Sequence, residues 1–341
     1  MSTPHARYSV KNLLMALVAA AMALVLAACG GTESTGSDDA TSGVKMSHKY
    51  GSTELPKNPK KVVTLGLNDQ DAVLSLGIKP VGVVDWFGER PYGSWPWTKQ
   101  KWGSTKPTIV GERDDFSIEK VAQLKPDLII AQYSGMTKDQ YEKLSKIAPT
   151  VGQPAKYPDY AAPWRVMTER IGRAVGKEAE AKQQIAEVDK KFQAIRKQHP
   201  EYAKQTVAVG DSFTPGEYAL FAAHDPKVEF MTDLGFKPSD RITKVAGKNN
   251  AAEVSAERLD LLDDADQMVW LLSDTAAEKR IKADETYQRS SVARQGRDLF
   301  IQYENPPIGA AVSFNTVLSI PYAIDNMAPL VEKQAAKEPA K

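Results

Sequence analysis

The sequence contains few of the residues on which disulfide bonding, metal binding and nucleic-acid binding depend. It has one cysteine and four histidines, and its 44 basic residues are balanced by 43 acidic ones. One cysteine cannot form a disulfide within the chain, so the folded part must rely on a hydrophobic core. A chain of this length with 42% hydrophobic residues can build one. The balanced charge offers no basic surface for a nucleic-acid partner.

The histidines do not form a pattern typical of an enzyme. They are His5, His48, His199 and His224. No two of them have the spacing of a zinc site, and the sequence has no Gly-x-Ser-x-Gly motif and no glycine-rich phosphate loop. Asp211 and Ser212 follow a predicted strand, as a nucleophile can, but no histidine motif accompanies them. We therefore do not expect an enzyme, and a secreted hydrolase is a distant alternative.

The longest apolar run lies at the N-terminus and has the layout of a secretory signal. Arg7 and Lys11 precede it, residues 13–28 carry no charge, and Ala27 and Ala28 are small. The run is shorter than the about 20 residues of a membrane-spanning helix, and no other run reaches that length. The pattern LAACG at 26–30 resembles a bacterial lipobox. It implies cleavage before Cys29, a lipid on its sulfur and retention at the outer face of the cytoplasmic membrane. An ordinary signal or an N-terminal anchor, with Cys29 there by chance, is the alternative.

Residues 29–45 are rich in Gly, Ser, Thr and Asp, and we interpret them as a flexible tether. From residue 46 to 160, short β-branched runs alternate with helical patterns. The predicted strands cover 62–65, 80–84 and 127–131, and the predicted helices cover 69–76, a stretch opening at Ser117, and 137–147. This alternation is typical of an α/β lobe with a largely parallel sheet.

A longer amphipathic pattern follows between residues 161 and 199. It predicts one connecting helix that begins near Trp164, adjusts around Gly176 and ends before Pro200. Residues 200–333 then resume the α/β pattern, and residues 334–341 form a polar tail. The second lobe has predicted strands at 206–209, 268–272 and 299–301, and predicted helices at 228–234, 255–262 and 312–327, the last interrupted at Pro321.

The two predicted lobes share a helix start. Ser117-Ile118-Glu119 and Ser255-Ala256-Glu257 each open a helix that leads into a strand, which favours a duplicated lobe, although Ser-x-Glu is a common helix start. The predicted fold class is α/β. It has two similar lobes with mostly parallel sheets, joined by one long rigid helix, with a ligand cleft between the lobes.

The sequence resembles the substrate-binding lipoproteins of iron–siderophore ABC importers. The resemblance covers residues 60 to 331 and is carried, in order, by KKVVTL at 60–65, NDQDAVLSLGIKPVGV at 68–83, SIEKVAQLKPDLII at 117–130 and YEKLSKIAPTV at 141–151. It implies capture of a ferric siderophore and its delivery to an integral-membrane ABC permease. It also implies that Glu119 and Glu257 dock onto permease arginines; alternatively, each only offsets a helix dipole. No cofactor is expected, because the ferric chelate is the ligand, and we expect a monomer.

The chemistry of such a ligand calls for aromatic walls. Ferric ion is hard and prefers oxygen ligands, so a chelator surrounds it and the protein meets a bulky organic complex. Six aromatic residues lie close together: Trp86, Phe87, Tyr92, Trp95, Trp97 and Trp102. Trp86 directly follows a predicted strand, where ligands of α/β proteins bind, and is the favoured pocket wall. Trp95, Trp97 and Trp102 either face the cleft or pack under a long loop.

Arg113 is the preferred charged contact, because a guanidinium is a fixed fork of donors for chelate oxygens. It also resembles a pocket arginine of hydroxamate-binding relatives, and a surface pair with Asp114 or Asp115 is the alternative. The other predicted ligand-binding residues are Asn68, Tyr133, Trp164, Phe213, Arg241, Tyr303 and Asn305. Trp164 either lines the cleft floor or is buried in the hinge.

The type of siderophore is less well determined by the sequence. Catecholate complexes are strongly anionic and would need several cleft arginines or lysines, whereas hydroxamate complexes are nearly neutral or cationic and suit aromatic walls. The many Trp and Tyr residues favour hydroxamates. Haem or cobalamin on the same fold is an alternative, with His224 as a possible axial ligand. A bare zinc or manganese ion would need several His and carboxylate ligands, and nothing positive indicates an interaction module without a small ligand.

Overall fold

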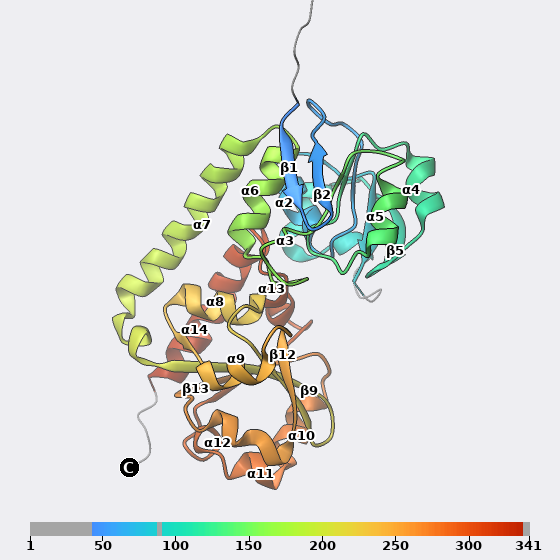
Figure 1. Ribbon diagram of the computed structural model, residues 1–341. Helices are drawn as coiled ribbons and strands as arrows, with labels where there is room; N and C mark the ends of the chain where they lie inside the picture. The colour runs from blue at the N-terminus through green and yellow to red at the C-terminus, as the bar shows by residue number, and fades with distance from the viewer. Residues whose placement is uncertain (1–42, 87–90, 337–341) are drawn as a thin grey trace, which may run out of the picture. The chain divides into compact units, whose positions relative to one another are not determined.

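The computed structural model describes residues 43–86 and 91–336 (Figure 1). The predicted signal peptide, Cys29 and Phe87 lie outside these residues. From Gly43 on, the chain folds as one compact unit that contains two α/β lobes. In the part that the structure describes, no helix combines the length and the apolar character needed to cross a lipid bilayer.

The N-terminal lobe is built on a six-stranded sheet in the order β6-β5-β4-β3-β7-β8. All neighbouring strands are parallel except β5 and β6, as the alternating pattern predicts. The strands are β3 (Val62–Thr64), β4 (Gly82–Asp85), β5 (Thr108–Glu112), β6 (Asp115–Phe116), β7 (Leu128–Ile130) and β8 (Thr150–Val151), and a separate antiparallel hairpin is formed by β1 (Lys45–His48) and β2 (Gly51–Glu54).

Two helices of this lobe begin at side-chain caps. The lobe contains α2 (Asp69–Ser75), α3 (Pro96–Trp102), α4 (Ile118–Leu124), α5 (Lys138–Leu144) and the short 3-10 helix η1 (Pro91–Gly93). The Ser117 hydroxyl accepts a hydrogen bond from the Lys120 backbone N–H at the start of α4. Thr137 and Gln140 form a capping box at the start of α5.

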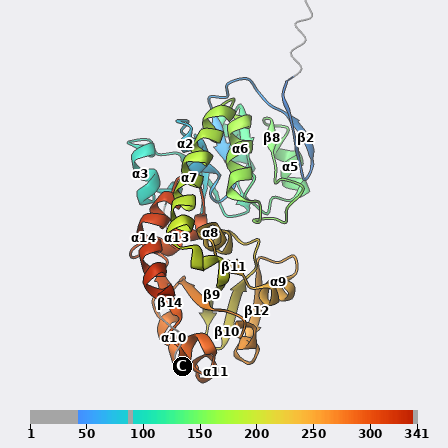
Figure 2. The ribbon, with the colours of Figure 1, turned by 90° about the vertical axis from the view of Figure 1, so that its left-hand side faces the viewer.

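The prediction of one long helix joining the lobes is confirmed, but that helix does not cover the whole of residues 161–199. The segment forms two helices, α6 (Trp164–Ala174) and α7 (Glu178–Gln198), which pack against each other as a hairpin (Figure 2). Gly176 has a φ of +73°, which allows the chain to reverse, and a Cβ at Gly172 would lie 2.3 Å from Ala181 Cβ. Helix α6 packs on α2 of the N-terminal lobe, so α7 alone connects the lobes.

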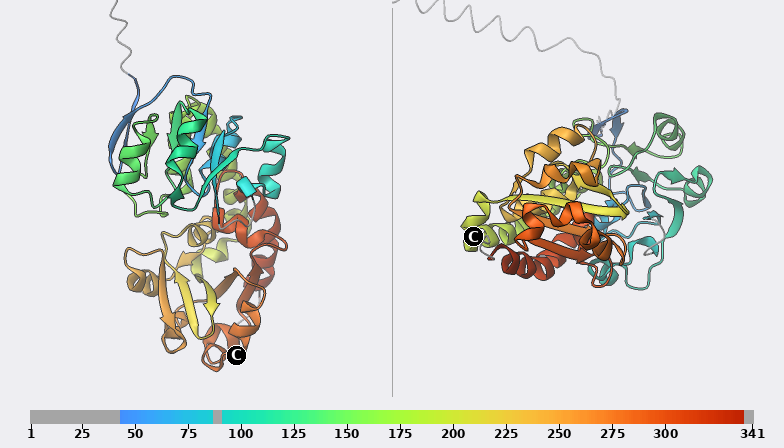
Figure 3. Two further views of the ribbon diagram at one scale, coloured as in Figure 1. Left: turned by 90° about the vertical axis from the view of Figure 1, so that its right-hand side faces the viewer. Right: turned by 90° about the horizontal axis from the view of Figure 1, so that it is seen from below.

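The C-terminal lobe has a mixed sheet in the order β12-β10-β9-β13-β14, with β11 beside β9. Its strands are β9 (Thr206–Thr214), β10 (Glu217–Phe221), β11 (Lys237–Pro238), β12 (Ala251–Ser255), β13 (Gln267–Leu272) and β14 (Asp298–Gln302). Its helices are α8 (Pro226–Leu234), α9 (Asp240–Ala246), α10 (Ala277–Ala283), α11 (Glu285–Gln288), α12 (Ser291–Arg294), α13 (Ile308–Phe314) and α14 (Ser319–Ala335), with 3-10 helices η2 (Pro200–Lys204) and η3 (Ala256–Leu262). Figure 3 shows the two sheets in separate lobes, coloured blue to green and yellow to orange.

Three of the five strand pairs in this sheet are parallel, as expected, but β9 turns back at Gly216, whose φ is +75°, so that β10 runs antiparallel to β9 and β12. Three other expectations for this lobe need correction. Ser255 precedes a 3-10 helix and makes no side-chain cap. The break in the last helical stretch lies at Asn315, which is left-handed, and not at Pro321; that proline sits in the first turn of α14, where its missing N–H costs little. The same helix extends through residues 334 and 335, which we expected in the tail.

The core joins the two lobes. Val207, Val209 and Val269 of the C-terminal sheet belong to the same buried cluster as Val62 and Val73 of the N-terminal lobe. We call this face of the C-terminal sheet the inner face. Alternate residues point the opposite way, to a second cluster that also contains α9 to α12 and η3; we call that side the outer face.

Candidate ligand-binding site

Four predicted site residues follow the carboxyl ends of parallel strands in the N-terminal lobe. Asn68 follows β3, Trp86 follows β4, Arg113 follows β5 and Tyr133 follows β7. Because these strand ends share one edge of the sheet, the fold brings the four residues to the same side of the lobe.

Arg113 is held at the sheet edge in an uncommon backbone conformation. Its φ is +49°, and its backbone N–H donates to the Asp85 carbonyl at 3.0 Å. The side chain is 49% exposed, its Nε lies 3.9 Å from Asp114 Oδ2, and its Cζ lies 5.5 Å from the centre of the Tyr160 ring. The ion pair with Asp114 that we considered therefore exists, yet it leaves half of the guanidinium side chain accessible to a ligand.

Tyr160 belongs to this group, although the sequence analysis did not identify it. Its hydroxyl donates to the Asp114 carboxylate, which also accepts the Gly135 backbone N–H at 2.8 Å. Its ring packs edge-on against Tyr133 at 5.3 Å between centroids, and its φ is +62°. Burial, followed by the Asp114 carboxylate, raises the pKa of Tyr160, so its hydroxyl stays protonated. No motif marks this residue, because its role depends on the fold of the 152–163 segment.

Tyr133 offers a hydrogen-bond donor to the site. Its side chain is buried, and within residues 43–86 and 91–336 its hydroxyl has no hydrogen-bond partner. Burial raises the pKa of Tyr133 well above its ordinary value, and the charges of Asp225 and Glu229 raise it further. Both carboxylates belong to the C-terminal lobe, at the start of α8, so Tyr133 lies where the two lobes face each other.

A second contact between the lobes lies close by. Asn250, just before β12, donates from its side-chain amide to the Tyr160 carbonyl at 3.3 Å. Arg113, Tyr133 and Tyr160 of one lobe therefore lie opposite Asp225, Glu229 and Asn250 of the other, and we call this arrangement the candidate site.

The tryptophan-rich segment mostly forms packing contacts. Trp95 and Trp102 are each 1% exposed, and Trp97 stacks on Trp95 at 5.2 Å between ring centroids. Packing under a loop, which we considered for these three, is what the structure contains. Trp86 is half-buried and stacks on Phe314 of the C-terminal lobe at 5.1 Å, and Tyr303 contacts Trp95 edge-on at 6.0 Å. Trp86 and Tyr303 therefore meet at the same junction between the lobes.

The remaining predicted contacts fall into different places. Asn68 is buried, and its side-chain amide donates to the Phe314 carbonyl at 2.8 Å. Trp164 is also buried, and its Nε1 donates to Asp233 at 3.0 Å, so it occupies the hinge position that we considered for it. Asn305 is exposed beyond β14. Arg241 does not join the others, because α9 packs on the outer face and its guanidinium is paired with Asp260 at 3.0 Å.

Behind the candidate site, buried carboxylates connect the lobes through residues 314–316, which we call the junction segment. Asp71 accepts hydrogen bonds from Thr316 Oγ1 at 2.6 Å and from Trp97 Nε1 at 3.0 Å. Glu229 accepts from Asn315 Nδ2 at 3.0 Å. Burial raises the pKa of Asp71 to about 7 and that of Glu229 to about 8. This junction is thus a polar network inside the apolar core.

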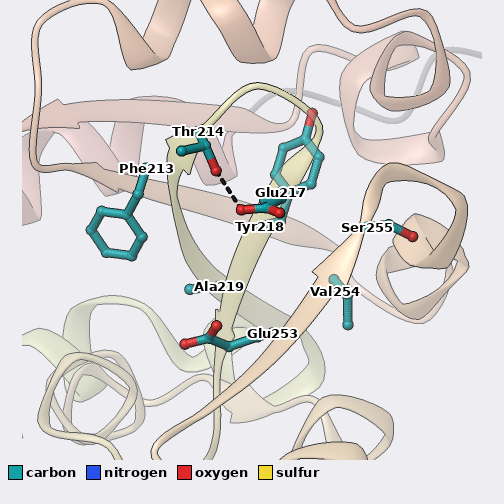
Figure 4. Close-up of a pocket in the computed structure, with 8 residues that line it drawn as sticks. All are labelled: Phe213, Thr214, Glu217, Tyr218, Ala219, Glu253, Val254 and Ser255. Carbon is teal, nitrogen blue, oxygen red and sulfur yellow. Dashed lines mark hydrogen bonds between the residues drawn. The ribbon is translucent and has the colours of Figure 1, made fainter.

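On the C-terminal lobe, the end of β9 borders a hollow of about 260 Å³. Its lining includes Phe213, Thr214, Glu217, Ala219, Glu253 and Ser255, and Figure 4 shows Phe213, Glu217 and Glu253 around Ala219. Phe213 is 60% exposed. We call this feature the Phe213 hollow.

The other residues that we singled out make simple contacts. Glu119 and Glu257 are exposed in the first turns of α4 and η3. His224 Nε2 lies 3.0 Å from the Asn249 carbonyl. No group of three or more His, Cys, Asp or Glu side chains is arranged to hold a metal ion within the described ranges.

Comparison with known proteins agrees with this architecture. Residues 62–301 match the family model described as "Periplasmic binding protein". The chain is 30% identical to the "Probable siderophore-binding lipoprotein YfiY" of Bacillus subtilis over 68% of this chain and 69% of that protein. It is 31% identical to the "Iron(3+)-hydroxamate-binding protein YxeB" of the same organism, over 72% and 74% of the two chains. It also superposes on Streptococcus pneumoniae PiaA in complex with ferrichrome with a TM-score of 0.74 and 26% identity, covering 86% of this chain and 99% of that one. The chain therefore belongs to the periplasmic binding protein family.

Proposed function

We propose that this protein binds a ferric siderophore of the hydroxamate type at the candidate site and delivers it to an ABC-type permease. The observation that carries the proposal is that the half-exposed Arg113 guanidinium lies on the same side of the lobe as the protonated Tyr133 hydroxyl, which has no hydrogen-bond partner among the described residues. Both groups donate hydrogen bonds, and the surface of a ferric hydroxamate presents oxygen acceptors. The names of the relatives, a siderophore-binding and an iron(3+)-hydroxamate-binding protein, support the same ligand class.

The charges around the site favour hydroxamates over catecholates. A ferric tris-catecholate is strongly anionic, whereas three hydroxamate anions balance Fe³⁺. Across from Arg113 and Tyr133, the Asp225 carboxylate is paired with Lys227, and burial raises the pKa of Glu229 to about 8, so these groups add no net positive charge that would attract an anionic complex. A nearly neutral or cationic chelate does not depend on such attraction.

The protein is further proposed to act outside the cytoplasm, as a monomer anchored by a lipid on Cys29. The LAACG pattern and the polar tether after it support this. Iron is cargo in this proposal, so the protein needs no cofactor of its own, and its role is binding rather than catalysis. Replacing Cys29 by Ser is expected to release the protein from the membrane fraction, and an unchanged membrane fraction would exclude the lipid anchor.

Intrinsic tryptophan fluorescence tests the ligand, because Trp86 and Trp95 lie at the junction between the lobes. The protein is titrated with a ferric trihydroxamate, a ferric tris-catecholate, haem and cobalamin. We expect saturable quenching by the trihydroxamate at the lowest concentration. Quenching by haem or cobalamin with no response to either ferric chelate would overturn the proposal.

A further inference from the structure

The Phe213 hollow lies on the inner face of the C-terminal sheet. Asp211 continues the alternation of Val207 and Val209 along β9, so it points to the inner face, and Phe213 follows it where the pairing with β10 shifts register and lines the hollow together with Ala219 and Glu253. Ala219 pairs directly with Asp211 on one side and with Glu253 on the other, and directly paired residues share a face. The hollow therefore opens on the side of the sheet that faces the N-terminal lobe.

The hollow is connected to the candidate site through β12. Glu253 lies in this strand, and Asn250, just ahead of it, donates to the Tyr160 carbonyl of the N-terminal lobe. Tyr160 in turn contacts Arg113 and Tyr133. Asn250 and Glu253 are three residues apart along the chain, so the hollow lies about 10 Å further along the C-terminal lobe from the contact with Tyr160.

The charges of the hollow are of one sign. Glu217 and Glu253 line it, and neither carboxylate has an ion-pair partner among the described residues. Two cations near the end of β9, Lys227 and Arg280, are engaged with other carboxylates. Lys227 lies 3.2 Å from Asp225, and Arg280, which donates to the Ser212 carbonyl, lies 2.6 Å from Asp274. Two uncompensated carboxylates therefore remain around the hollow.

The ring of Phe213 is the second feature. It is the only aromatic side chain among the exposed large hydrophobic residues in the part of the chain that the structure describes. An exposed ring at the border of a hollow, with carboxylates beside it, is the combination that attracts an organic cation, through its π-face and through charge.

We propose that the Phe213 hollow is a subsite for the protonated amine of an amine-bearing ferric hydroxamate. This inference rests on the proposed function and adds the orientation of the bound ligand. The chelate oxygens lie toward Arg113 and Tyr133, and the ammonium group lies between Phe213 and Glu253. A linear trihydroxamate with a free terminal amine gives such a ligand, since its ferric core is neutral and its amine carries the charge.

The test compares two ligands that differ only in that charge. Ferric desferrioxamine B, which has a free terminal amine, and its N-acetylated derivative are titrated into the whole protein with tryptophan fluorescence as the readout. The wild-type protein is expected to bind the amine form about fivefold more tightly, the combined effect of an exposed cation–π contact and exposed ion pairs. This preference should shrink as salt is added.

Variants then assign the preference to the hollow. Glu217→Gln with Glu253→Gln should remove it while leaving the affinity for the N-acetylated form within about twofold, because an exposed pair contributes little else. Glu187→Gln, an exposed site on α7, loses the same kind of charge and should keep the preference. Equal affinity of the wild-type protein for both forms would overturn the subsite alone, as would a preference that survives in the double variant. Failure of the wild-type protein to bind either form would overturn the proposed function as well.

Discussion

Thr316 of the C-terminal lobe donates a hydrogen bond of 2.6 Å to Asp71 of the N-terminal lobe, and both side chains are buried. The same hydroxyl accepts the Ser319 backbone N–H at 3.0 Å, at the start of α14. One side chain therefore satisfies a buried carboxylate and a helix N-terminus at the contact between the lobes.

Replacing Thr316 by Val removes both hydrogen bonds with little change of shape. We expect the free energy of unfolding to fall by about 2 to 3 kcal/mol, because a buried carboxylate and a backbone N–H lose their partner. Urea unfolding followed by tryptophan fluorescence measures the change. Thr316→Ser keeps the hydroxyl and should lose clearly less; equal losses in the two variants would contradict this role of the hydrogen bonds.

The buried carboxyl groups give stability a specific pH dependence. Burial raises the pKa of Asp71 to about 7 from an ordinary value of 3.8. Between these values the unfolded chain releases this proton and the native protein keeps it. The contribution of Asp71 is therefore fully present below pH 4 and is lost as the pH rises through 7. Asp69, with its pKa raised by burial to about 6, and Glu229, with its pKa raised to about 8, act in the same direction.

Asp71→Asn isolates this effect, since the amide cannot ionise. We expect the free energy of unfolding of the variant, relative to wild type, to increase between pH 4.5 and pH 8.5. Urea unfolding at a series of pH values provides the measurement. A difference between the two proteins that does not change with pH would contradict the raised pKa of Asp71.

Arg113 is the residue of the candidate site whose loss should weaken binding most. Arg113→Asn suits the left-handed backbone at this position, so the substitution tests the side chain rather than the turn. We expect the affinity for a ferric trihydroxamate to fall about 10- to 100-fold, the value of charge-assisted hydrogen bonds. Arg113→Lys keeps the charge but not the planar arrangement of donors, so its affinity should lie between those of the wild-type protein and Arg113→Asn. Wild-type affinity in Arg113→Asn would remove Arg113 from the site.

The predicted docking residues can be separated from ligand binding. Glu119→Ala combined with Glu257→Ala should lower uptake of radioactive ferric siderophore by whole cells about tenfold or more, because both carboxylates are exposed and can orient the encounter with a basic partner. The affinity of the isolated variant should stay unchanged. Lost affinity would instead assign these glutamates to the fold or to the ligand site.

The sequence predicts the individual elements better than their connections. The strands near 62, 128 and 268 and the cap at Ser117 follow from local patterns, and the structure confirms them. The reversal at Gly176 was not predicted, because the apolar spacing on both sides of a glycine is the same in a bent helix and in a hairpin. The antiparallel strand β10 was not predicted either, because the alternation of residues along a strand does not show that the chain reverses at Gly216.

The site divides in a similar way. Arg113 and Tyr133 each follow a parallel strand in the sequence, and the structure places both at one edge of the sheet, because the carboxyl ends of parallel strands lie at the same edge. Tyr160 reaches them from a loop far along the chain, and no local rule could place it there. Arg241 lies apart from these residues, and the sequence could not indicate this, because no local pattern tells which face of the sheet its helix covers.

The hairpin of α6 and α7 has a mechanical consequence. One end of α7 is braced by α6 along the N-terminal lobe, and α7 also packs against α8 and α14 of the C-terminal lobe. A connecting helix that is packed at both ends in this way resists bending, and the Thr316–Asp71 hydrogen bond resists rotation of one lobe against the other. The small-angle scattering curves of the ligand-bound and the ligand-free protein should then nearly superimpose. A transporter that distinguishes the two forms must recognise the protein surface around the ligand, because the lobes do not close by a large movement.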